Sequence, residues 1–180
     1  MVLIKTLTAS SSSTVSFVDG ASGVVLDNTY PIYRFVFTTI HGSANANFVF
    51  QTSTDTGSSY GVTLTSTFFN NWQNEAGNDT TLAYSTSNDI AQGTSFQRLL
   101  KHSGNADDAG SGTLTLFNPS STTFVKHFIS DGNSANNTYS QRELVAGYFN
   151  TTSAIDAVQF KMASGNIDSG TFKLYGIKDS

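Results

Sequence analysis

Apolar and polar side chains alternate along short stretches of this chain, and the alternation recurs from one end of the sequence to the other. In YRFVFTT, residues 33–39, the side chains of Tyr33, Phe35 and Phe37 fall on one face of an extended segment. In TLTLF, residues 113–117, Leu114 and Leu116 do the same. A period of two is typical of a β-strand that buries one face. The pattern therefore predicts strands rather than amphipathic helices.

Eleven segments have this character and are separated by turn-forming residues such as those in DGASG and NADDAGSG. They cover residues 3–8, 14–18, 33–39, 47–53, 62–67, 81–86, 113–117, 123–129, 145–150, 154–162 and 171–177. SDGNSANN, residues 130–137, is read as another turn. Two short helical segments are expected at residues 68–75 and 140–144. The fold class predicted is all-β: an antiparallel, jelly-roll-like β-sandwich of about ten strands.

The whole chain, residues 1–180, is expected to form one such domain, because it contains no internal repeat and no linker. The N-terminal residues 1–8 have two possible assignments. VLIKTL has few polar residues for a solvated tail, which predicts either an edge strand or an arm that adds to a partner's sheet. Val2, Leu3 and Ile4 are therefore candidate interaction residues.

Charge is sparse, at 12% of residues with a net charge of −4. A nucleic-acid-binding domain would present a basic face, so no nucleic-acid partner is expected. Arg98, Lys101 and His102 form the one small basic cluster, and we expect it to be solvated surface. Ser and Thr contribute 49 residues and Phe 14, whereas Glu occurs only twice, which agrees with an all-β fold.

The chain has no cysteine, so disulfides and thiolate metal sites are excluded. The N-terminal apolar run is too short, and is broken by Lys5, to be a secretory signal. No apolar run has the length of a membrane span, and no membrane partner is expected. We expect synthesis in the cytoplasm without export of this kind.

One stretch matches a catalytic pattern. GSSYG, residues 57–61, fits G-x-S-x-G, which would place Ser59 as the nucleophile of an α/β-hydrolase. That motif requires a helix directly after the serine, and GVTLTSTFF is strand-like instead. A hairpin loop with glycines at positive φ is the preferred interpretation, and no catalytic residue is predicted.

Histidines and aspartates offer weaker candidates. His41, His102 and His127 are too widely spaced to suggest a site from sequence. Several aspartates lie in glycine-containing turns and could supply oxygen ligands to calcium, but aspartate also serves turns by bonding to their backbone. The turn role is preferred, so neither a metal nor another cofactor is predicted. These aspartates are Asp19, Asp55, Asp107, Asp108, Asp131 and Asp168.

The segment FFNNWQN, residues 68–74, is the strongest candidate for a contact surface. Phe68, Phe69 and Trp72 lie among asparagine and glutamine residues, a combination suited to holding a sugar. The preferred interpretation is nevertheless a loop whose large side chains plug one end of the sandwich or enter a subunit contact.

A resemblance to a known family extends over nearly all 180 residues. The stretches that carry it, in order, are TASSSSTVSFVDG, YPIYRFVFTTIHGSANANFVFQTSTDTGSSY, TSTFFNNW, LAYSTSNDIAQGTSFQ, GSGTLTLFNPSSTTFVKHF and VAGYFNTTSAIDAVQFKMASGNIDSGTFKLYGI. They resemble virion structural proteins encoded by marine tailed bacteriophages. The glycine turn followed by a strand ending in Leu174–Tyr175–Gly176–Ile177 is the most specific element.

The resemblance implies a non-enzymatic jelly-roll protein located in the virion. A free-standing domain without a coiled-coil shaft suits a capsid decoration, or cement, protein that sits as a homotrimer on the head and binds the major capsid protein. The alternative is a tail-fibre module that binds a receptor or carbohydrate through the segment around Trp72. The resemblance is to scaffold strands, so it transfers no functional residue.

Overall fold

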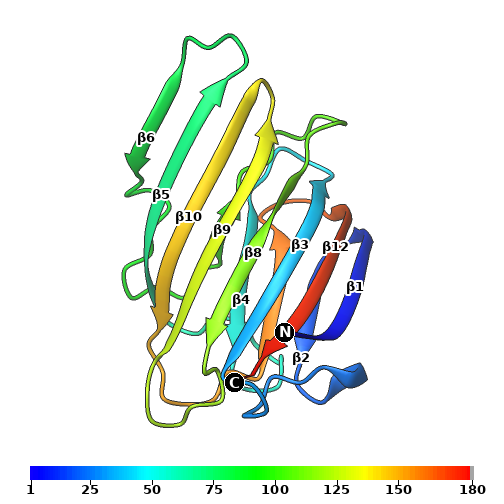
Figure 1. Ribbon diagram of the computed structural model, residues 1–180, viewed down its shortest axis with the longest axis vertical. Coiled ribbons are helices and arrows are strands. Elements are labelled where there is room, and N and C mark those ends of the chain that lie inside the picture. The colour runs from blue at the N-terminus through cyan, green and yellow to red at the C-terminus, as the bar shows by residue number, and fades with distance from the viewer. Residues whose placement is uncertain (179–180) are drawn as a thin grey trace.

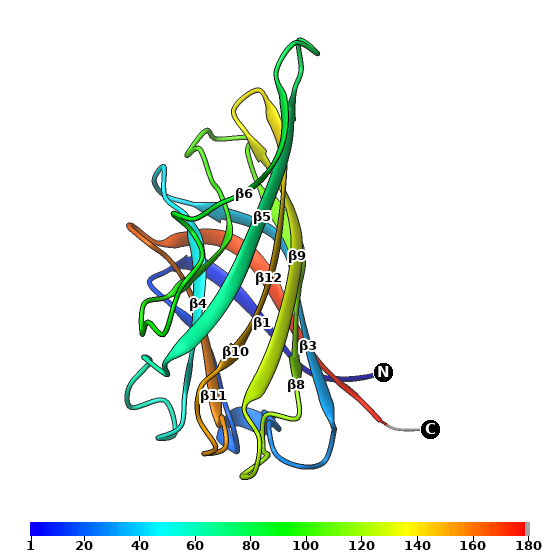
Figure 2. The ribbon, with the colours of Figure 1, turned by 90° about the vertical axis from the view of Figure 1, so that its left-hand side faces the viewer.

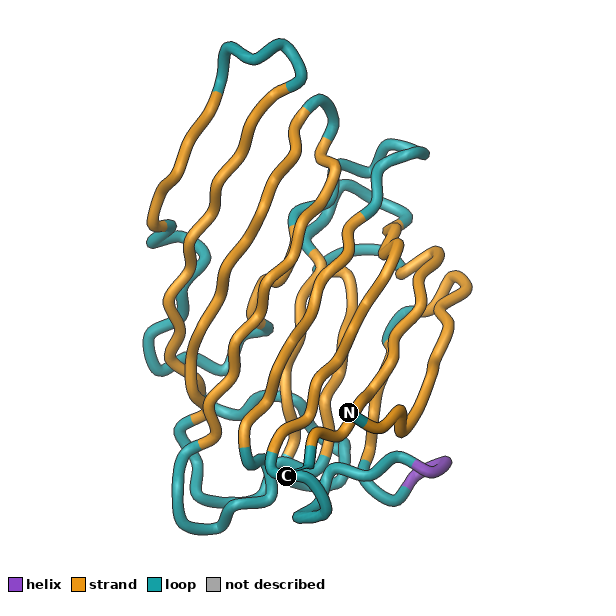
Figure 3. Tube along the Cα trace, viewed as in Figure 1, coloured by secondary structure: helices purple, strands orange, loops and turns teal. Residues whose placement is uncertain are grey.

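The computed structural model describes residues 1–178, and its regular structure is almost entirely β-strand (Figure 3). One 3-10 turn, η1 (Ala21–Gly23), is the exception. The strands are β1 (Val2–Ser12), β2 (Val15–Val18), β3 (Ile32–Gly42), β4 (Phe48–Ser53), β5 (Leu64–Asn74), β6 (Thr80–Tyr84), β7 (Gln97–Leu100), β8 (Gly110–Phe117), β9 (Lys126–Asn136), β10 (Tyr139–Phe149), β11 (Ala157–Met162) and β12 (Ile167–Ile177). The predicted all-β class is confirmed.

These strands form two antiparallel sheets that pack face to face (Figure 2). The larger sheet has eight strands in the order β1-β12-β3-β8-β9-β10-β5-β6, and the smaller has four in the order β2-β11-β4-β7. If β5, β6, β9 and β10 are set aside, the orders become β1-β12-β3-β8 and β2-β11-β4-β7. Successive strands of this set mostly lie in opposite sheets. Two four-stranded sheets connected in this way are the arrangement of a jelly roll. The predicted jelly-roll-like sandwich is therefore confirmed.

The four additional strands extend the larger sheet past the smaller one, and we call them the wing (Figure 1). They enter as two hairpins, β5–β6 between β4 and β7, and β9–β10 between β8 and β11. β10 pairs with β5 along the full length of both strands, from Tyr139–Asn74 to Phe149–Leu64. Because the smaller sheet ends at β7, much of the wing has no second layer of sheet over it.

Phenylalanine fills the space between the two sheets. Phe160 of β11 lies at the centre, with its ring centroid 5.4 to 6.4 Å from those of six other phenylalanines. The six are Phe17, Phe35, Phe37, Phe48, Phe50 and Phe172, and all are buried. The alternation that predicted the strands places these rings on inward faces from both sheets.

The two predicted helical segments are wrong. Residues 68–75 belong mostly to β5, and residues 140–144 belong to β10. In β10 the usual pattern is inverted, because Gln141 and Glu143 face inward and are buried while Leu144 faces outward. An inward polar pair hides the period of two, so the segment did not look like a strand. The turn expected at residues 130–137 is also wrong over most of its length, since β9 continues to Asn136.

Of residues 1–8, all but Met1 lie in β1, which forms an edge of the eight-stranded sheet and pairs with β12 from Val2–Gly176 to Ser12–Ile167. Within residues 1–178, no helix is long and apolar enough to cross a membrane.

Candidate functional site

The wing presents an outer face, and an inner face whose buried residues, such as Phe68 and Val145, join the core while the rest extends beyond it. Its inner face is turned toward the side of the smaller sheet, and its outer face is turned away from it. Side chains alternate between the two along β5, so Asn70 and Trp72 face inward and Phe69 and Asn71 face outward. Neighbouring residues of one strand therefore serve different surfaces.

A polar groove runs along the inner face, and we call it the inner groove. It begins as a hollow of about 470 Å³ between the wing and the end of β7. A second hollow of about 390 Å³ continues it past the β9–β10 turn and shares Lys101, Asn136 and Tyr139 with the first. The first is lined by Asn70, Trp72, Asp79, Ser85, Ser87, Asn88, Arg98, Lys101, Asn136, Tyr139 and Gln141. Both volumes are in the range of ligand pockets in proteins.

The groove is anchored by an ion pair between the two sheets. The Arg98 guanidinium of β7 donates to both carboxylate oxygens of Glu143 in β10. The Glu143 side chain is fully buried, and the Arg98 side chain is 13% exposed. Arg98 also donates to the side-chain oxygen of Asn88 at 3.2 Å and lies over the Phe68 ring. The expectation that Arg98 belongs to solvated surface is therefore wrong, because it pairs with a carboxylate 45 residues away.

Two side-chain amides are hydrogen-bonded in sequence to the Glu143 carboxylate of this ion pair. Gln141 donates to Glu143 at 2.9 Å, and Asn136 donates to Gln141 at 3.1 Å. Burial raises the pKa of the Glu143 carboxyl, and the nearby Arg98 charge opposes that rise. At the rim, the Tyr139 hydroxyl donates to Asp79 at 2.9 Å, and this hydrogen bond raises the pKa of Tyr139.

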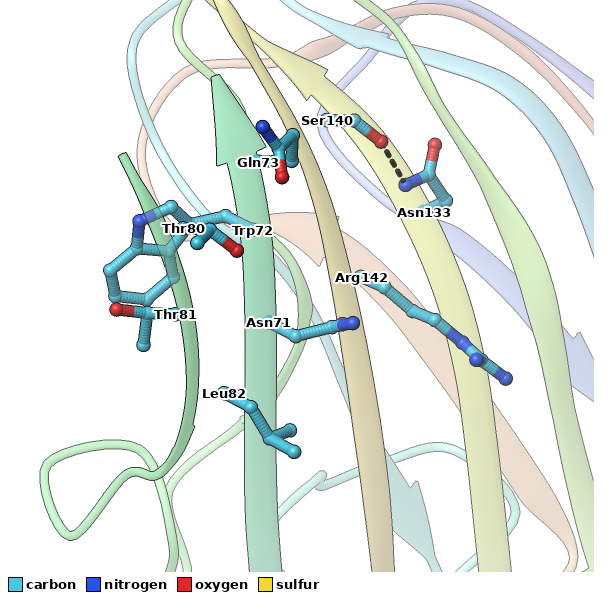
Figure 4. A pocket seen from close by; sticks show the side chains of 9 residues that line it. All are labelled: Asn71, Trp72, Gln73, Thr80, Thr81, Leu82, Asn133, Ser140 and Arg142. Atoms are coloured by element: carbon cyan, nitrogen blue, oxygen red, sulfur yellow. Dashed lines mark hydrogen bonds between the residues drawn. The ribbon is translucent and has the colours of Figure 1, made fainter. Parts of the chain in front are cut away.

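The outer face carries a shallow hollow at the tip of the wing (Figure 4). Trp72 and Thr81 lie on its β6 side, the Asn71 side chain extends from β5 toward β10, and the Arg142 side chain extends from β10 over β9. Asn133 donates to the Ser140 hydroxyl at 3.1 Å across its other side. Trp72 is the residue that lines both this hollow and the inner groove.

Next to the hollow, five apolar side chains are exposed on the outer face, and we call them the outer apolar patch. The Phe69 and Tyr84 rings meet edge to face with their centroids 5.1 Å apart, and Phe69 lies opposite Leu144 in the β5–β10 register. The patch consists of Phe69, Leu82, Tyr84, Ile129 and Leu144, with 37% to 78% of each residue exposed. Asp131 and Arg142 form an exposed ion pair at its border.

The structure separates the three aromatic residues predicted to act together. Phe68 faces inward, is fully buried and belongs to the core, so it is not part of a contact surface. Phe69 belongs to the outer apolar patch. Trp72 is half-buried, and its indole nitrogen lies 3.5 Å from an Asp79 carboxylate oxygen. Strand geometry is the reason, since residues 68 and 69 must point to opposite faces.

Val2, Leu3 and Ile4 lie at the start of β1. Val2 and Leu3 are about half exposed, whereas Ile4 packs against the core. The register shifts between Leu3 and Lys5, and the Lys5 amine donates to the Ser22 carbonyl at 2.8 Å. A bulge and a lysine are common protections of an edge strand against unwanted pairing.

Ser59 lies in the loop between β4 and β5, as the loop interpretation predicts. Its hydroxyl donates to Asp55 at 2.5 Å, and the Ser53 hydroxyl donates to the other Asp55 oxygen at 2.6 Å. These bonds lower the pKa of Asp55 to about 2. Asp55 therefore organises the turn, which is the role preferred for the aspartates of this chain.

Other aspartates organise turns by accepting hydrogen bonds from backbone N–H groups. Asp19 accepts from the Leu26 amide at 2.8 Å and Asp108 from the Asn137 amide at 2.6 Å. His41 and His102, distant in sequence, meet with their ring centroids 4.8 Å apart, while His127 lies near Tyr148. Among residues 1–178, no group of three or more His, Asp or Glu residues is arranged to hold a metal ion.

Most lining residues of the inner groove could not be found from the sequence. Asn88 lies far in the sequence from the β9–β10 hairpin that carries Asn136 and Tyr139, and only the fold brings them together beside Trp72. Comparisons with protein-family models, with curated proteins and with solved structures find no match for this chain.

Proposed function

We propose that this protein is a non-enzymatic structural protein of a tailed-phage particle, namely a decoration (cement) protein that binds and stabilises the head. The outer apolar patch is the observation that supports this role best. A monomeric protein seldom exposes a group of large apolar side chains without a partner for them. The patch lies on a broad sheet face, which suits a contact with a flat, repetitive surface.

The position of the patch supports the same role. Its residues come from all four wing strands, so the contact surface is held by backbone hydrogen bonds of the sheet rather than by a loop. A rigid surface loses little conformational entropy on binding. Many weak contacts of this kind, repeated over a lattice and within an oligomer, would add up to firm attachment.

The resemblance to phage virion proteins supplies the rest of the proposal. The partner would be the major capsid protein, the oligomer a homotrimer at local three-fold positions, and the location the capsid surface of the virion. Closed symmetry would also let each subunit bury apolar surface against its copies.

The number of copies per particle tests the proposal directly. Quantitative mass spectrometry of purified virions should give a count on the order of hundreds, in a simple ratio to the major capsid protein as lattice symmetry requires. A count of about a dozen or fewer would move the protein to the tail, and absence from virions would refute a structural role. A fluorophosphonate probe should leave Ser59 unlabelled, because the proposal assigns it no catalytic role.

A second candidate function is a tail-fibre module that binds a receptor carbohydrate. One observation favours it, namely that Trp72 borders a groove rich in amides and hydroxyls. Binding to a glycan array that is lost in Trp72→Ala would support this function. Binding to empty heads together with no binding to any glycan would refute it.

A further inference from the structure

We infer that the inner groove is the binding site for an oligosaccharide. The inference rests on the second candidate function and specifies its site, its ligand class and the residues that contact the ligand. It does not depend on the outer apolar patch, because the patch lies on the opposite face of the wing.

The shape of the groove comes from the mismatch in width of the two sheets. The smaller sheet stops at β7, whereas the larger one continues through β10, β5 and β6. This step leaves a concave strip, with the inner face of the wing as its floor and β7 and the segment before it as one wall. The two hollows that form it share three residues, so the groove is longer than a single pocket. An elongated ligand therefore suits it better than a compact one.

The floor of the groove is held in place before any ligand arrives. The Arg98–Glu143 pair, with Gln141 and Asn136 bonded to it in sequence, fixes the side chains nearest β7. On the wall, Asn88 accepts from Arg98 and donates to Ser85 at 2.7 Å. Buried, mutually bonded groups of this kind change shape little on binding, so the ligand need not order them.

Other groups on the lining have hydrogen-bonding capacity to spare. Across the described chain, neither the Asn70 amide nor the Lys101 amine takes part in a side-chain hydrogen bond, and Lys101 is exposed at the rim. Asn136 uses its nitrogen on Gln141 and keeps its oxygen. The Tyr139 hydroxyl donates to Asp79 and can still accept. These groups can bond to a ligand without breaking the network beneath them.

The balance of donors and acceptors selects the class of ligand. Amides and hydroxyls both donate and accept, as the hydroxyl groups of a sugar do. A site for a highly charged anion would offer donors alone, and here the Arg98 charge is already neutralised by Glu143. A site for a cation would offer several carboxylates, whereas Asp79 is occupied by its bonds with Tyr139 and Trp72. A hydroxyl-rich ligand with little charge matches the lining best.

Two aromatic residues complete the match. Trp72 and Tyr139 both line the groove near the tip of the wing. The Trp72 indole N–H and the Tyr139 hydroxyl both donate to the Asp79 carboxylate. Large aromatic side chains with a bonded polar end offer apolar surface while leaving little freedom of movement. Such surface suits the C–H faces of sugar rings, and the adjoining amides suit their hydroxyl edges.

The experiment uses the full-length protein and an array that carries hexamers of glucose, N-acetylglucosamine and mannuronic acid together with bacterial surface glycans. The strongest ligand is then titrated by calorimetry. We expect Asn70→Ala to weaken its binding about tenfold, which corresponds to the loss of one or two hydrogen bonds. Lys101→Ala should weaken it as well, and Trp72→Ala should abolish detectable binding.

Asn71→Ala is the matched control. It makes the same substitution one residue further along β5, on the outer face, and should bind the ligand as the unmodified protein does. Thermal unfolding of each variant excludes loss of fold as the cause of any effect. Loss of binding in Asn71→Ala with retention in Asn70→Ala would overturn the assignment to the inner groove while leaving carbohydrate binding itself intact. No binding to any glycan by the unmodified protein would refute both the inference and the second candidate function.

Discussion

Arg98 and Glu143 form an ion pair that connects the edge of the smaller sheet to the wing of the larger one. Its carboxylate is fully buried, so neither partner can be removed without leaving the other poorly solvated. The pair also fixes the floor of the inner groove. Stability and the proposed binding site are thus coupled at one contact.

We expect Arg98→Met to lower the free energy of unfolding at neutral pH by about 3–5 kcal/mol, because it leaves the Glu143 charge buried and unpaired. Protonation of Glu143 would relieve this cost. Burial raises the folded-state pKa of Glu143 above its usual 4.5, and loss of Arg98 would raise it further. A raised carboxyl pKa favours the folded state at low pH, and that benefit is lost as the pH rises through the folded-state pKa.

The deficit of Arg98→Met should therefore be smallest at acidic pH and grow toward neutrality. Urea unfolding of both proteins between pH 4 and pH 8 would measure it. Replacing both partners, as in Arg98→Met with Glu143→Leu, should recover most of the lost stability. A deficit in the single variant that does not change with pH would contradict this account.

The phenylalanine core makes a second prediction. Phe160→Ala should lower the free energy of unfolding by about 3–5 kcal/mol, because it removes the ring at the centre of the cluster and leaves a cavity. Phe124→Ala is the matched control, since Phe124 is 70% exposed and should change stability by less than about 0.5 kcal/mol. Urea denaturation of both variants makes the comparison, and equal losses would contradict the assignment of Phe160 to the core.

A third prediction concerns the outer apolar patch. Phe69→Ser combined with Leu144→Ser should weaken binding to empty phage heads at least tenfold, as sedimentation with purified heads would show. Stability should fall by only about 1 kcal/mol, since exposed cross-strand pairs contribute about that much. Thr6→Ser, an exposed substitution in β1, should leave attachment unchanged. Full binding by the double variant would exclude the patch as the contact surface.

His102 gives the fourth prediction. It is buried, and its ring nitrogens face the backbone N–H groups of Gly42 at 2.6 Å and Gly104 at 2.8 Å. Burial, with a smaller contribution from His41, lowers the pKa of His102 below its usual 6.5. As the pH falls, the unfolded chain therefore binds a proton at this histidine before the folded protein does. The stability that neutral His102 contributes is complete above pH 6.5 and is lost as the pH falls toward the folded-state pKa.

Between pH 8 and pH 5 the contribution of His102 to stability should accordingly decrease toward the acidic end, and His102→Gln should remove it, so the difference in stability between the two proteins should shrink as the pH falls. Glu143, whose raised pKa acts in the opposite sense, is present in both proteins and cancels in this difference. The aspartates whose pKa is lowered titrate below their usual 3.8, so they change little in this window. A difference that stays constant with pH would show that His102 is not the group responsible.

The fifth prediction concerns β1. Deleting residues 1–8 should lower the free energy of unfolding by about 2–4 kcal/mol, because Ile4 and Leu7 pack against the core and β12 would lose its partner. Retention of full stability would favour the arm over the edge strand. The separate hypothesis that this segment adds to a capsid-protein sheet fails if the deleted protein folds and binds heads as before.

The sequence predicted strands where apolar side chains alternate and the inward side is uniformly apolar, as in β3, β8 and β11. It failed where polar residues point inward. β7 was missed because it has only four residues and includes Gln97 and Arg98. Glu143 misled the assignment of β10 for the same reason. Its position two residues from Val145 and two from Gln141, all on one face, was the signal that could have identified the strand.

The candidate site was partly accessible from the sequence. Trp72 could be recognised as a candidate binding residue from its amide-rich neighbours. Its inner-groove partners could not, because Asn136 and Tyr139 reach it through the pairing of β10 with β5, and Arg98 reaches it from the other sheet. The separation of Phe68 from Phe69 needed only the knowledge that this segment is a strand. The error in secondary structure therefore carried over directly into the site.

The pairing of β1 with β12 brings Val2 opposite Gly176, so both ends of the described fold emerge side by side (Figure 1). They do so at the opposite end of the sheet from the β5–β6 turn at the tip of the wing. A peptide or fluorescent domain fused to either terminus would consequently project away from the tip and should leave both of its faces unobstructed. The same geometry would allow the chain to be circularised through a short linker and reopened in an exposed loop, and cargo could then be placed at a chosen distance from the proposed contact surface.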